Sequence, residues 1–240
     1  MTELETDRLL IREVIVSDAD DFLRYWQQDD YRRHVPIEPP TADFIAAKVN
    51  GWIQSQNQNP RTVYHLVVTH KRSNQMVGDA GLYIRSISSR QGEIGWGVIS
   101  SHTGQGLATE IGRALLGLAF DTLSLHRVFA QCSVENLASR RIMTKLGIHE
   151  EAVLRENVFA RGEWWSSVQS SILSTEWGNA TKAESHRSRY AAPSPILALR
   201  RCKYRSGAPL PRTRKLFTKL SSARCGRRTR AITPPRSSTD

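Results

Sequence analysis

The sequence predicts an α/β domain with a mixed sheet, followed by a basic tail, and three observations support this. Strand and helix patterns follow one another in the order βααβββαβαββ over residues 1–179. A glycine loop joins one strand to the strongest helical pattern, which is typical of a crossover between parallel strands. The composition then changes abruptly near residue 179.

The net charge of +11 is unevenly distributed along the 240 residues. Residues 180–240 hold 16 Lys and Arg and 2 Asp and Glu, whereas residues 1–179 hold 18 basic and 21 acidic residues. The first part is therefore an ordinary, slightly acidic sequence, long enough for one domain with a real core or two small ones. The second part is rich in Pro, Ser and Arg and lacks apolar periodicity, so we expect a disordered tail.

Several classes of protein are not expected from this composition. No apolar run reaches the 18 residues that favour a membrane span, and the acidic N-terminus lacks the apolar segment of a signal peptide. Cys132, Cys202 and Cys225 are too widely spaced to predict a disulfide framework or a metal site. We therefore expect a cytoplasmic protein that contacts no membrane and uses no metal.

The N-terminal half predicts one strand, two helices and a hairpin. Arg8–Arg12 is a short apolar run typical of a strand, and Ser17 is a candidate N-cap for the helix that follows. Thr41 is a candidate N-cap for a second helix with apolar residues at helical spacing up to Ile53. Tyr64–Val68 and Met76–Ile84 flank a hydrophilic turn, which predicts a β-hairpin.

The C-terminal half alternates strands and helices before a final strand pair. Its predicted strands are Glu93–Val98, Arg127–Val134, Gly147–Leu154 and Trp164–Leu173. The strongest helix runs from Gly106 to about Leu123 with an apolar stripe, and a shorter one runs from Asn136 to Leu146. Gly147 is placed as the glycine that follows the end of that helix.

The most informative segment runs from Glu93 to Glu110 as strand, glycine loop and first helical turn. This order brings backbone N–H groups and the positive end of a helix dipole together, which is typical of a phosphate site. The Gly-Lys-Ser/Thr ending of a nucleoside-triphosphate loop is missing. Thr109 replaces the third glycine of a dinucleotide fingerprint. The segment therefore favours a phosphate-bearing cofactor other than ATP or NAD, although a simple tight turn at Gly104 and Gly106 would have the same sequence.

The run Thr103-Gly-Gln-Gly-Leu-Ala108 resembles the acyl-CoA loop, Gln/Arg-x-x-Gly-x-Gly/Ala, of the GCN5-related N-acetyltransferase (GNAT) superfamily. Thr103 departs from that pattern at its first position. Further segments are similar to the ribosomal-protein Nα-acetyltransferase (Rim-type) branch: Thr6–Arg12, Asp18-Ala19, Leu125–Val128, Val134–Ser139, Leu146-Gly147 and Leu154–Glu156. The resemblance spans about residues 4–178. It implies the GNAT acyl-CoA N-acyltransferase fold, whose central, mostly antiparallel sheet is splayed and flanked by helices.

This resemblance implies acetyl transfer from acetyl-CoA to an amine, and it assigns residues to the cofactor. The CoA diphosphate would lie on the backbone amides of the loop and first helical turn, which are Thr103, Gly104, Gln105, Gly106, Leu107, Ala108 and Thr109. Pantetheine would pair with backbone groups near Val98 and Ile99, where the strand departs from its neighbour; packing under Trp96 is the alternative explanation for Gly95 and Gly97. Asn136 would contact the CoA arm, or act only as an N-cap.

The catalytic residues are less well determined by the sequence. Ser139 matches the family position near the thioester sulfur and is a candidate acid for the leaving thiolate, or an exposed residue of the first helical turn. Glu93 is the first candidate for the general base and Glu156 the second, each alternatively an ordinary surface charge. No Cys–His pair is evident, so we expect direct attack in a ternary complex. Trp164 and Trp165 would flank the acceptor cleft or serve as core and rim aromatics.

The expected partner is an amine acceptor, either a protein N-terminus or a small amine such as an antibiotic, polyamine or amino acid. For the tail from Ala180, contact with a ribosome or nucleic acid through its basic residues, a solvated appendage without function, and an altered reading frame remain open. The first of these would make this a nucleic-acid-binding protein in which the acyl-CoA fold is secondary. A monomer and a homodimer are both compatible with the sequence.

Overall fold

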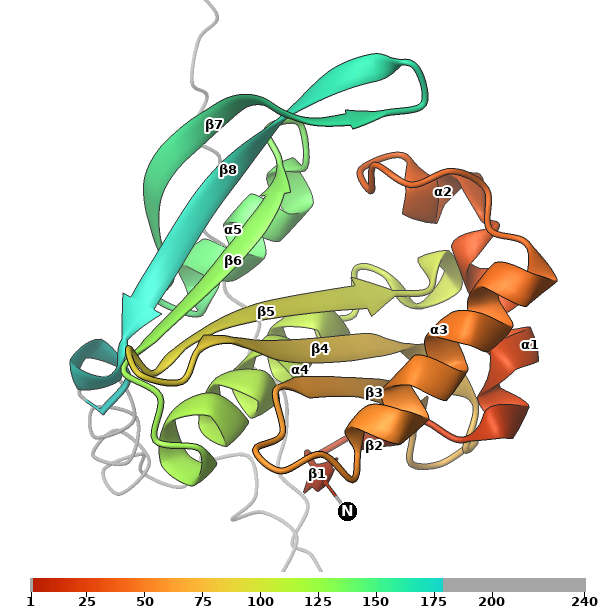
Figure 1. The fold of residues 1–240 in the computed structure, drawn as a ribbon, viewed down its shortest axis with the longest axis horizontal. Helices are drawn as coiled ribbons and strands as arrows, with labels where there is room; N and C mark the ends of the chain where they lie inside the picture. The colour runs from red at the N-terminus through yellow and green to blue at the C-terminus, as the bar shows by residue number, and fades with distance from the viewer. Residues whose placement is uncertain (1, 179–240) are drawn as a thin grey trace, which may run out of the picture. The chain divides into compact units, whose positions relative to one another are not determined.

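The computed structural model describes residues 2–178, which contain one eight-stranded sheet in the order β1-β2-β3-β4-β5-β6-β8-β7 (Figure 1). The strands are β1 (Glu3–Glu5), β2 (Leu9–Glu13), β3 (Val63–His70), β4 (Met76–Ser86), β5 (Gln91–Val98), β6 (Arg127–Ser133), β7 (His149–Ala160) and β8 (Glu163–Leu173). Neighbouring strands are antiparallel except β5 and β6, which are parallel. The predicted mixed, mostly antiparallel sheet is confirmed.

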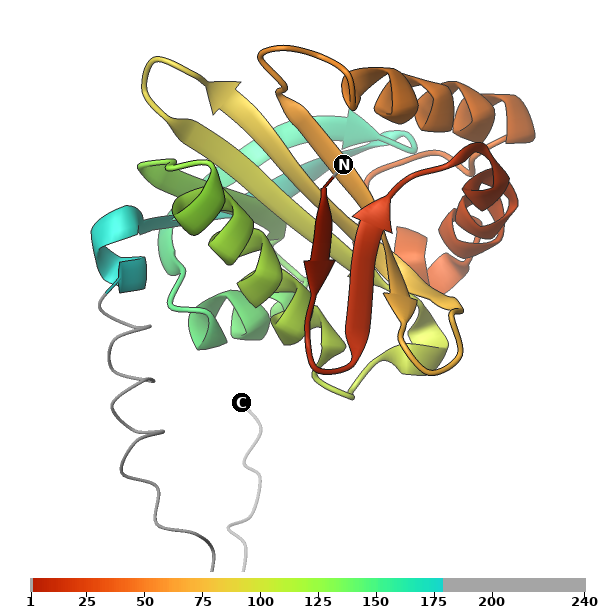
Figure 2. The same cartoon turned by 90° about the horizontal axis from the view of Figure 1, so that it is seen from below.

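Helices cover both faces of the sheet (Figures 1 and 2). The helical segments are η1 (Val16–Asp18), α1 (Ala19–Trp26), α2 (Asp29–Arg32), α3 (Ala42–Ser55), η2 (Ser100–His102), α4 (Leu107–Gly117), the π-helical η3 (Leu118–Thr122) and α5 (Leu137–Lys145). α1 and α3 enclose one apolar cluster with their face of the sheet, and α4 with η3 encloses the larger cluster on the opposite face. Burial of these two faces is the main stabilising contribution to the fold.

The predicted order of strands and longer helices is confirmed, and the structure adds short elements that include β1, α2 and a helical segment at residues 174–178. The three-residue strand β1 pairs only with β2 at the edge of the sheet, and α2 is a single four-residue turn. Neither is long enough to show a periodic pattern in the sequence. The helix predicted from Gly106 to Leu123 is divided into α4 and the π-helical η3.

Two of the predicted helix-terminal residues are confirmed by the structure, and one is not. Thr41 caps α3, since its hydroxyl accepts the Phe44 N–H at 3.2 Å, and Gly147 follows α5 with φ +75°. The expectation for Ser17 is wrong, because α1 begins after Asp18. The Asp18 carboxylate accepts the Ile15 N–H at 2.8 Å and is paired with Arg12, and these contacts fix the start of the segment instead.

No helix within residues 2–178 is long and apolar enough to cross a membrane. The basic tail expected from Ala180, with Cys202 and Cys225, lies outside the residues that the structure describes.

Candidate active site

The parallel strands β5 and β6 diverge, and this opens the sheet at its centre (Figure 1). They pair only at Gln91, Gly92 and Glu93, opposite Arg127, Val128 and Phe129. Beyond Glu93 no further pairing joins the two strands. The implied splayed sheet is therefore present, with a wedge-shaped gap along the second half of β5.

Backbone groups of β5 face this gap. Ile99 N–H donates to the Val77 carbonyl at 2.9 Å, which fixes the phase of the ladder between β4 and β5. Hydrogen-bonded and non-hydrogen-bonded pairs alternate in an antiparallel ladder, so N–H and C=O of alternate residues point away from β4. Those of Trp96 and Val98 consequently point into the gap, where an extended ligand could pair with them.

The same ladder gives the backbone of Ile99 partners within the protein, and its expected role toward CoA stays a prediction. Its N–H is used by Val77, and its carbonyl accepts the His102 N–H at 2.8 Å at the start of η2. Both backbone groups of Ile99 are thus engaged within the protein. The backbone N–H and C=O of Trp96, two residues before Val98, point into the gap and could pair with pantetheine in place of those of Ile99.

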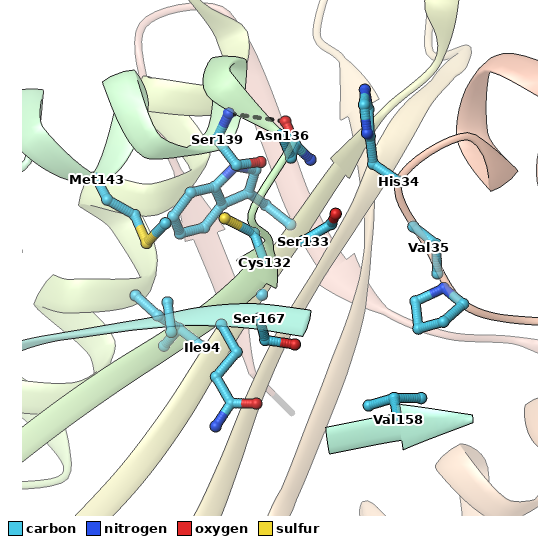
Figure 3. Close-up of a pocket in the computed structure, with 15 residues that line it drawn as sticks. His34, Val35, Ile94, Cys132, Ser133, Asn136, Ser139, Met143, Val158 and Ser167 are labelled. Carbon is cyan, nitrogen blue, oxygen red and sulfur yellow. Dashed lines mark hydrogen bonds between the residues drawn. The ribbon is translucent and has the colours of Figure 1, made fainter. Parts of the chain in front are cut away.

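A cavity of about 260 Å³ lies in the gap between β5 and β6 (Figure 3). Its lining comes from both strands, the start of α5, the loop after α2 and the hairpin of β7 and β8: His34, Val35, Pro36, Ile94, Gly95, Trp96, Ala130, Gln131, Cys132, Ser133, Asn136, Ser139, Met143, Val158 and Ser167. Residues from both faces of the sheet contribute. The cavity therefore gives a ligand on the α4 and α5 face access to the opposite face.

The glycines of β5 keep this region open. A Cβ built on Gly95 would have no heavy atom within 4 Å, so a side chain here would extend into free space rather than into packed protein. Trp96 points to the other face and packs against α4, where a Cβ on Gly112 would lie 3.6 Å from its ring. Packing under Trp96 thus does not account for Gly95, because the two residues face opposite sides of the strand.

The loop before α4 has the conformation that its glycines predict. Gly104 and Gly106 have φ +75° and +78°, in the left-handed region that glycine adopts without steric cost. Gly106 is the N-cap of α4, and no side chain caps the helix. The first amide groups of an α-helix have no partner within the helix, so those of Leu107, Ala108 and Thr109 remain available at this end.

The loop is also exposed, as a phosphate site must be. Thr103, Gly104, Gln105 and Gly106 are all exposed, and Leu107 is the first buried residue. The Thr103 hydroxyl donates to the Ser100 carbonyl at 2.8 Å and so closes the preceding η2. Of the seven residues predicted for the diphosphate, the first four are therefore exposed, and the other three form the first turn of α4 at its positive end.

Sequence reasoning missed the ion pair that holds this loop. The Glu110 carboxylate, in the first turn of α4, accepts hydrogen bonds from the Thr6 hydroxyl (2.5 Å), the Arg8 N–H (3.0 Å) and Arg8 Nε (2.7 Å). Arg8 also donates to the Gln105 carbonyl at 2.8 Å. Burial raises the pKa of Glu110, but the hydrogen bonds from Thr6 and Arg8 outweigh it and hold the pKa below its ordinary value.

Asn136 and Ser139 meet at the cavity, as expected (Figure 3). Asn136 is the N-cap of α5, and its Oδ1 accepts the Ser139 N–H at 3.0 Å. The cap leaves the Asn136 amide nitrogen and the Ser139 hydroxyl for other contacts. The N-cap interpretation of Asn136 is confirmed, and its second expected role toward CoA stays a prediction.

The candidate bases are not brought to the cavity wall. Glu93 lies on the same face of β5 as Gly95 and Gly97, but its carboxylate is held by Arg85 at 2.6 Å. Glu156 lies in the bulge of β7, with φ +47°, among residues 153–157 of a separate surface pocket. Neither residue lines the cavity between β5 and β6.

The two tryptophans of β8 lie at a separate pocket beside the end of β6. Trp164 is 61% exposed and contacts Phe159, whereas Trp165 is covered by the Arg161 guanidinium. They are rim aromatics of the hairpin of β7 and β8, and neither lines the cavity in the sheet.

Two further cavity residues carry chemistry that the sequence pattern did not indicate. Burial raises the pKa of the Cys132 thiol to about 11, so it is protonated and a weak nucleophile near neutral pH. His34, in the loop after α2, lies at the cavity wall (Figure 3), and its Nδ1 has no hydrogen-bond partner within residues 2–178. The sequence pattern did not indicate that His34 lines the cavity, because this depends on how the loop packs over the sheet.

Comparison with known proteins identifies the family of the chain. The family model described as acetyltransferase (GNAT) domain matches residues 8–149. The uncharacterized N-acetyltransferase YnaD of Bacillus subtilis (strain 168) is 28% identical over 174 residues, which cover 72% of this chain and 98% of YnaD.

Two solved structures share the fold. One is the ribosomal-protein-S5-alanine acetyltransferase from Vibrio fischeri, with a TM-score of 0.64 and 19% identity over 74% of this chain and 99% of that chain. The other is the spermidine N-acetyltransferase from Vibrio cholerae in complex with CoA and spermine, with a TM-score of 0.64 and 20% identity over 72% of this chain and 99% of that chain. At these identities the likeness concerns the fold alone.

Proposed function

Because the chain belongs to the acetyltransferase (GNAT) family, it is an acetyl-CoA-dependent N-acetyltransferase, and we propose that it acetylates a primary amine by direct attack in a ternary complex. The observation that carries the proposed mechanism is the uncapped, exposed start of α4 beside the gap between β5 and β6. One feature suits the diphosphate of CoA and the other suits its pantetheine arm.

The diphosphate would be held by the amides of residues 103–109. Glycine at 104 and 106 permits close approach of the backbone, and the helix dipole of α4 favours the negative charge by roughly 0.3–1 kcal/mol per charge. Arg8 adds a guanidinium beside the same turn while it fixes the loop through Gln105 and Glu110.

The thioester would lie between β5 and β6, with pantetheine paired to the backbone of Trp96 and Val98. An N–H of β5 aimed into the gap would stabilise the oxyanion that forms when the amine attacks the thioester carbonyl. Because the Cys132 thiol is protonated, an acyl-enzyme intermediate on this residue is not favoured. Direct attack needs only that the amine be placed and deprotonated.

Ser139 is proposed to protonate the leaving thiolate, with Asn136 contacting the CoA arm. Their place at the start of α5, facing Cys132 and Met143, supports both roles. Glu93 remains the proposed general base. Glu93 lies on the same face of β5 as Gly95, which suits this role. Its carboxylate is paired with Arg85, so Arg85 must release the carboxylate before Glu93 can accept a proton.

The acceptor is proposed to be a protein N-terminal α-amine, in line with the Rim-type resemblance, and a small amine is the alternative. An α-amine has a pKa near 8 and needs less help in losing its proton than a lysine-like amine near 10.4. One of the two similar folds acts on a ribosomal protein and the other on spermidine, so the fold itself is compatible with both classes.

A thiol-release assay on the full chain tests the proposed function. Acetyl-CoA should be bound, and CoA should be released only when an amine is added, with peptides and small amines compared as acceptors. A chain truncated after residue 179 should retain both properties. Loss of cofactor binding in both forms would contradict the proposal. Salt-sensitive nucleic-acid binding that requires residues 180–240 would instead favour a role of the 16 basic residues in that segment.

A further inference from the structure

A second cavity of about 240 Å³ adjoins the first on the face of the sheet covered by α1 and α3. The two cavities share Val35, Gly95 and Trp96, so they meet where β5 leaves β6. An acceptor in the second cavity would therefore reach the gap past Gly95, whose missing side chain leaves the passage open.

One carboxylate dominates the second cavity. Asp79 on β4 is 7% exposed, and it is the only acidic residue of the lining, which contains no Lys or Arg. Its Oδ2 lies 3.3 Å from His65 Nε2, and its Oδ1 has no hydrogen-bond partner within residues 2–178. The buried Tyr25 hydroxyl lies beside the same carboxylate, and burial followed by Asp79 raises the pKa of Tyr25. A buried carboxylate with an unpaired oxygen is costly unless a cation or hydrogen-bond donor meets it.

The surrounding residues hold this carboxylate in place. The Tyr83 hydroxyl lies 2.8 Å from His65 Nδ1, and Trp52 stacks on the His65 ring at 3.7 Å. A Cβ on Gly97 would collide with the Tyr25 hydroxyl and would lie 2.5 Å from Asp79 Oδ1, so glycine at this position of β5 gives both groups their room. Asp79 is thus fixed directly beside the strand that borders the thioester.

The rest of the lining is aromatic. Trp26 and Tyr31 stack at a centroid distance of 5.6 Å and, with Tyr83, line the cavity. Burial, followed by the charge of Asp79, raises the pKa of Tyr31 and of Tyr83, so both phenols are neutral near pH 7. Aromatic faces attract cations and also accept an apolar body.

We propose that this second cavity is the acceptor site, where Asp79 binds the ammonium group of a primary amine that has an apolar body and no carboxylate on the neighbouring carbon. The proposal rests on the proposed acetyltransferase function and names its substrate class. A free amino acid is disfavoured because its own carboxylate would face Asp79, and the lining contains no Lys or Arg to pair with it. A small amine and the N-terminal residue of a peptide present the same favoured chemistry.

The experiment compares matched acceptors on the full chain by acetyl-CoA-dependent thiol release. Phenethylamine and phenylalanine differ only in the carboxylate, and phenylalanine amide and a peptide with an N-terminal Phe separate the small amine from the peptide. We expect kcat/KM for phenethylamine or for the peptide to exceed that for phenylalanine at least about tenfold. Equal or better use of phenylalanine would overturn the proposal, as would no turnover of any of these amines by protein that binds acetyl-CoA.

Variants then test Asp79 itself. Asp79→Asn keeps the shape but removes the charge, and should raise KM for the favoured amine about ten- to hundredfold while the Kd for acetyl-CoA changes less than about twofold. Asp30→Asn on α2, whose carboxylate is 60% exposed, removes the same charge outside the cavity and should leave KM unchanged. An unchanged KM in Asp79→Asn would overturn the proposal. If that variant does not fold, the acceptor comparison on the unaltered chain still decides.

A failure of this proposal can be told from a failure of the proposed function. Loss of acetyl-CoA binding in the unaltered chain would contradict the function itself. Cofactor binding together with acetylation of an acceptor that ignores Asp79 would contradict only the acceptor site.

Discussion

The two helices that begin beside the active-site gap differ at their N-termini. α5 begins at Asn136, whose side chain accepts the Ser139 N–H, whereas α4 begins at Gly106 with no side-chain cap. α4 follows β5 after η2, and α5 follows β6, so each helix comes after one of the two diverging strands. The protein therefore satisfies one helix end with a side chain and leaves the other without a side-chain cap.

This difference offers a reason why α4 has no capping side chain, although one would stabilise the helix. A side-chain N-cap contributes about 1 kcal/mol, and α4 forgoes it in favour of a glycine with φ +78°. Water can satisfy the exposed amides at this end, and the diphosphate of CoA would replace that water in the proposed complex. The capped helix serves to position Asn136 and Ser139 instead.

The largest effect is expected from Gly106→Glu at the open helix end. A Glu at φ +78° is strained, and its carboxylate would repel the diphosphate, so affinity for acetyl-CoA should fall at least about a hundredfold. Calorimetric titration measures this. Gly51→Glu is the matched control, because a Cβ there meets no atom within 4 Å and the site lies in α3. Unaltered affinity in Gly106→Glu would reject the loop assignment.

A smaller loss is expected when the support of the loop is removed. Arg8→Ala deletes the hydrogen bonds to the Gln105 carbonyl and Glu110, so the loop should become less ordered and acetyl-CoA should bind about tenfold more weakly. Arg24→Ala, which removes an exposed pair with Asp21, is the control and should not alter binding. Equal affinities of the two variants would show that the loop does not depend on Arg8.

The support that Glu110 gives to the loop through Arg8 should be lost on acidification. The folded-state pKa of Glu110 lies below its ordinary value of 4.5, so its contribution to stability is present above that value. It should be lost as the pH falls from 4.5 through the folded-state pKa. Thermal unfolding of Glu110→Gln should therefore differ most from that of the unaltered protein near neutral pH, and the two should converge in acid. A difference that grows on acidification would contradict this sign.

The capped helix predicts a different response. Asn136→Ala should reduce the free energy of unfolding by about 1 kcal/mol, because the Ser139 N–H loses its acceptor, whereas Asn136→Asp should keep the cap. If Asn136 also contacts the CoA arm, Asn136→Asp should weaken cofactor binding without loss of stability. Denaturant unfolding and titration of the same variants separate the two roles. An unchanged stability of Asn136→Ala would show that the cap is unimportant.

The smallest effect concerns the chemical reactivity of the cavity. With Cys202 and Cys225 replaced by Ser, iodoacetamide should alkylate Cys132 slowly at neutral pH. The alkylation rate should increase as the pH is raised toward the thiol pKa of about 11, because only the thiolate reacts. Acetyl-CoA should slow the reaction, since the thiol lines the cavity proposed for the thioester. Labelling that is fast at pH 7, or unaffected by the cofactor, would place Cys132 elsewhere than in a buried cofactor cavity.

Features fixed by local sequence were predictable, and those that depend on distant pairs were not. The glycine loop, the Asn136 cap and the Gly147 terminus each rest on backbone conformations that specific residue types favour. By contrast, Arg8 and Glu110 are 102 residues apart, and His65 meets Asp79 only because β3 pairs with β4. The Glu93 pair with Arg85 and the engaged backbone of Ile99 likewise follow from strand register, which residue types alone did not define.

A structure of the full chain with acetyl-CoA would locate the cofactor relative to α4 and to the gap. We expect the diphosphate within hydrogen-bond distance of the backbone amides of residues 103–109, and pantetheine paired with Trp96 and Val98 in the gap between β5 and β6. A diphosphate bound away from the start of α4, or a gap closed by direct pairing of the two strands, would contradict this expectation.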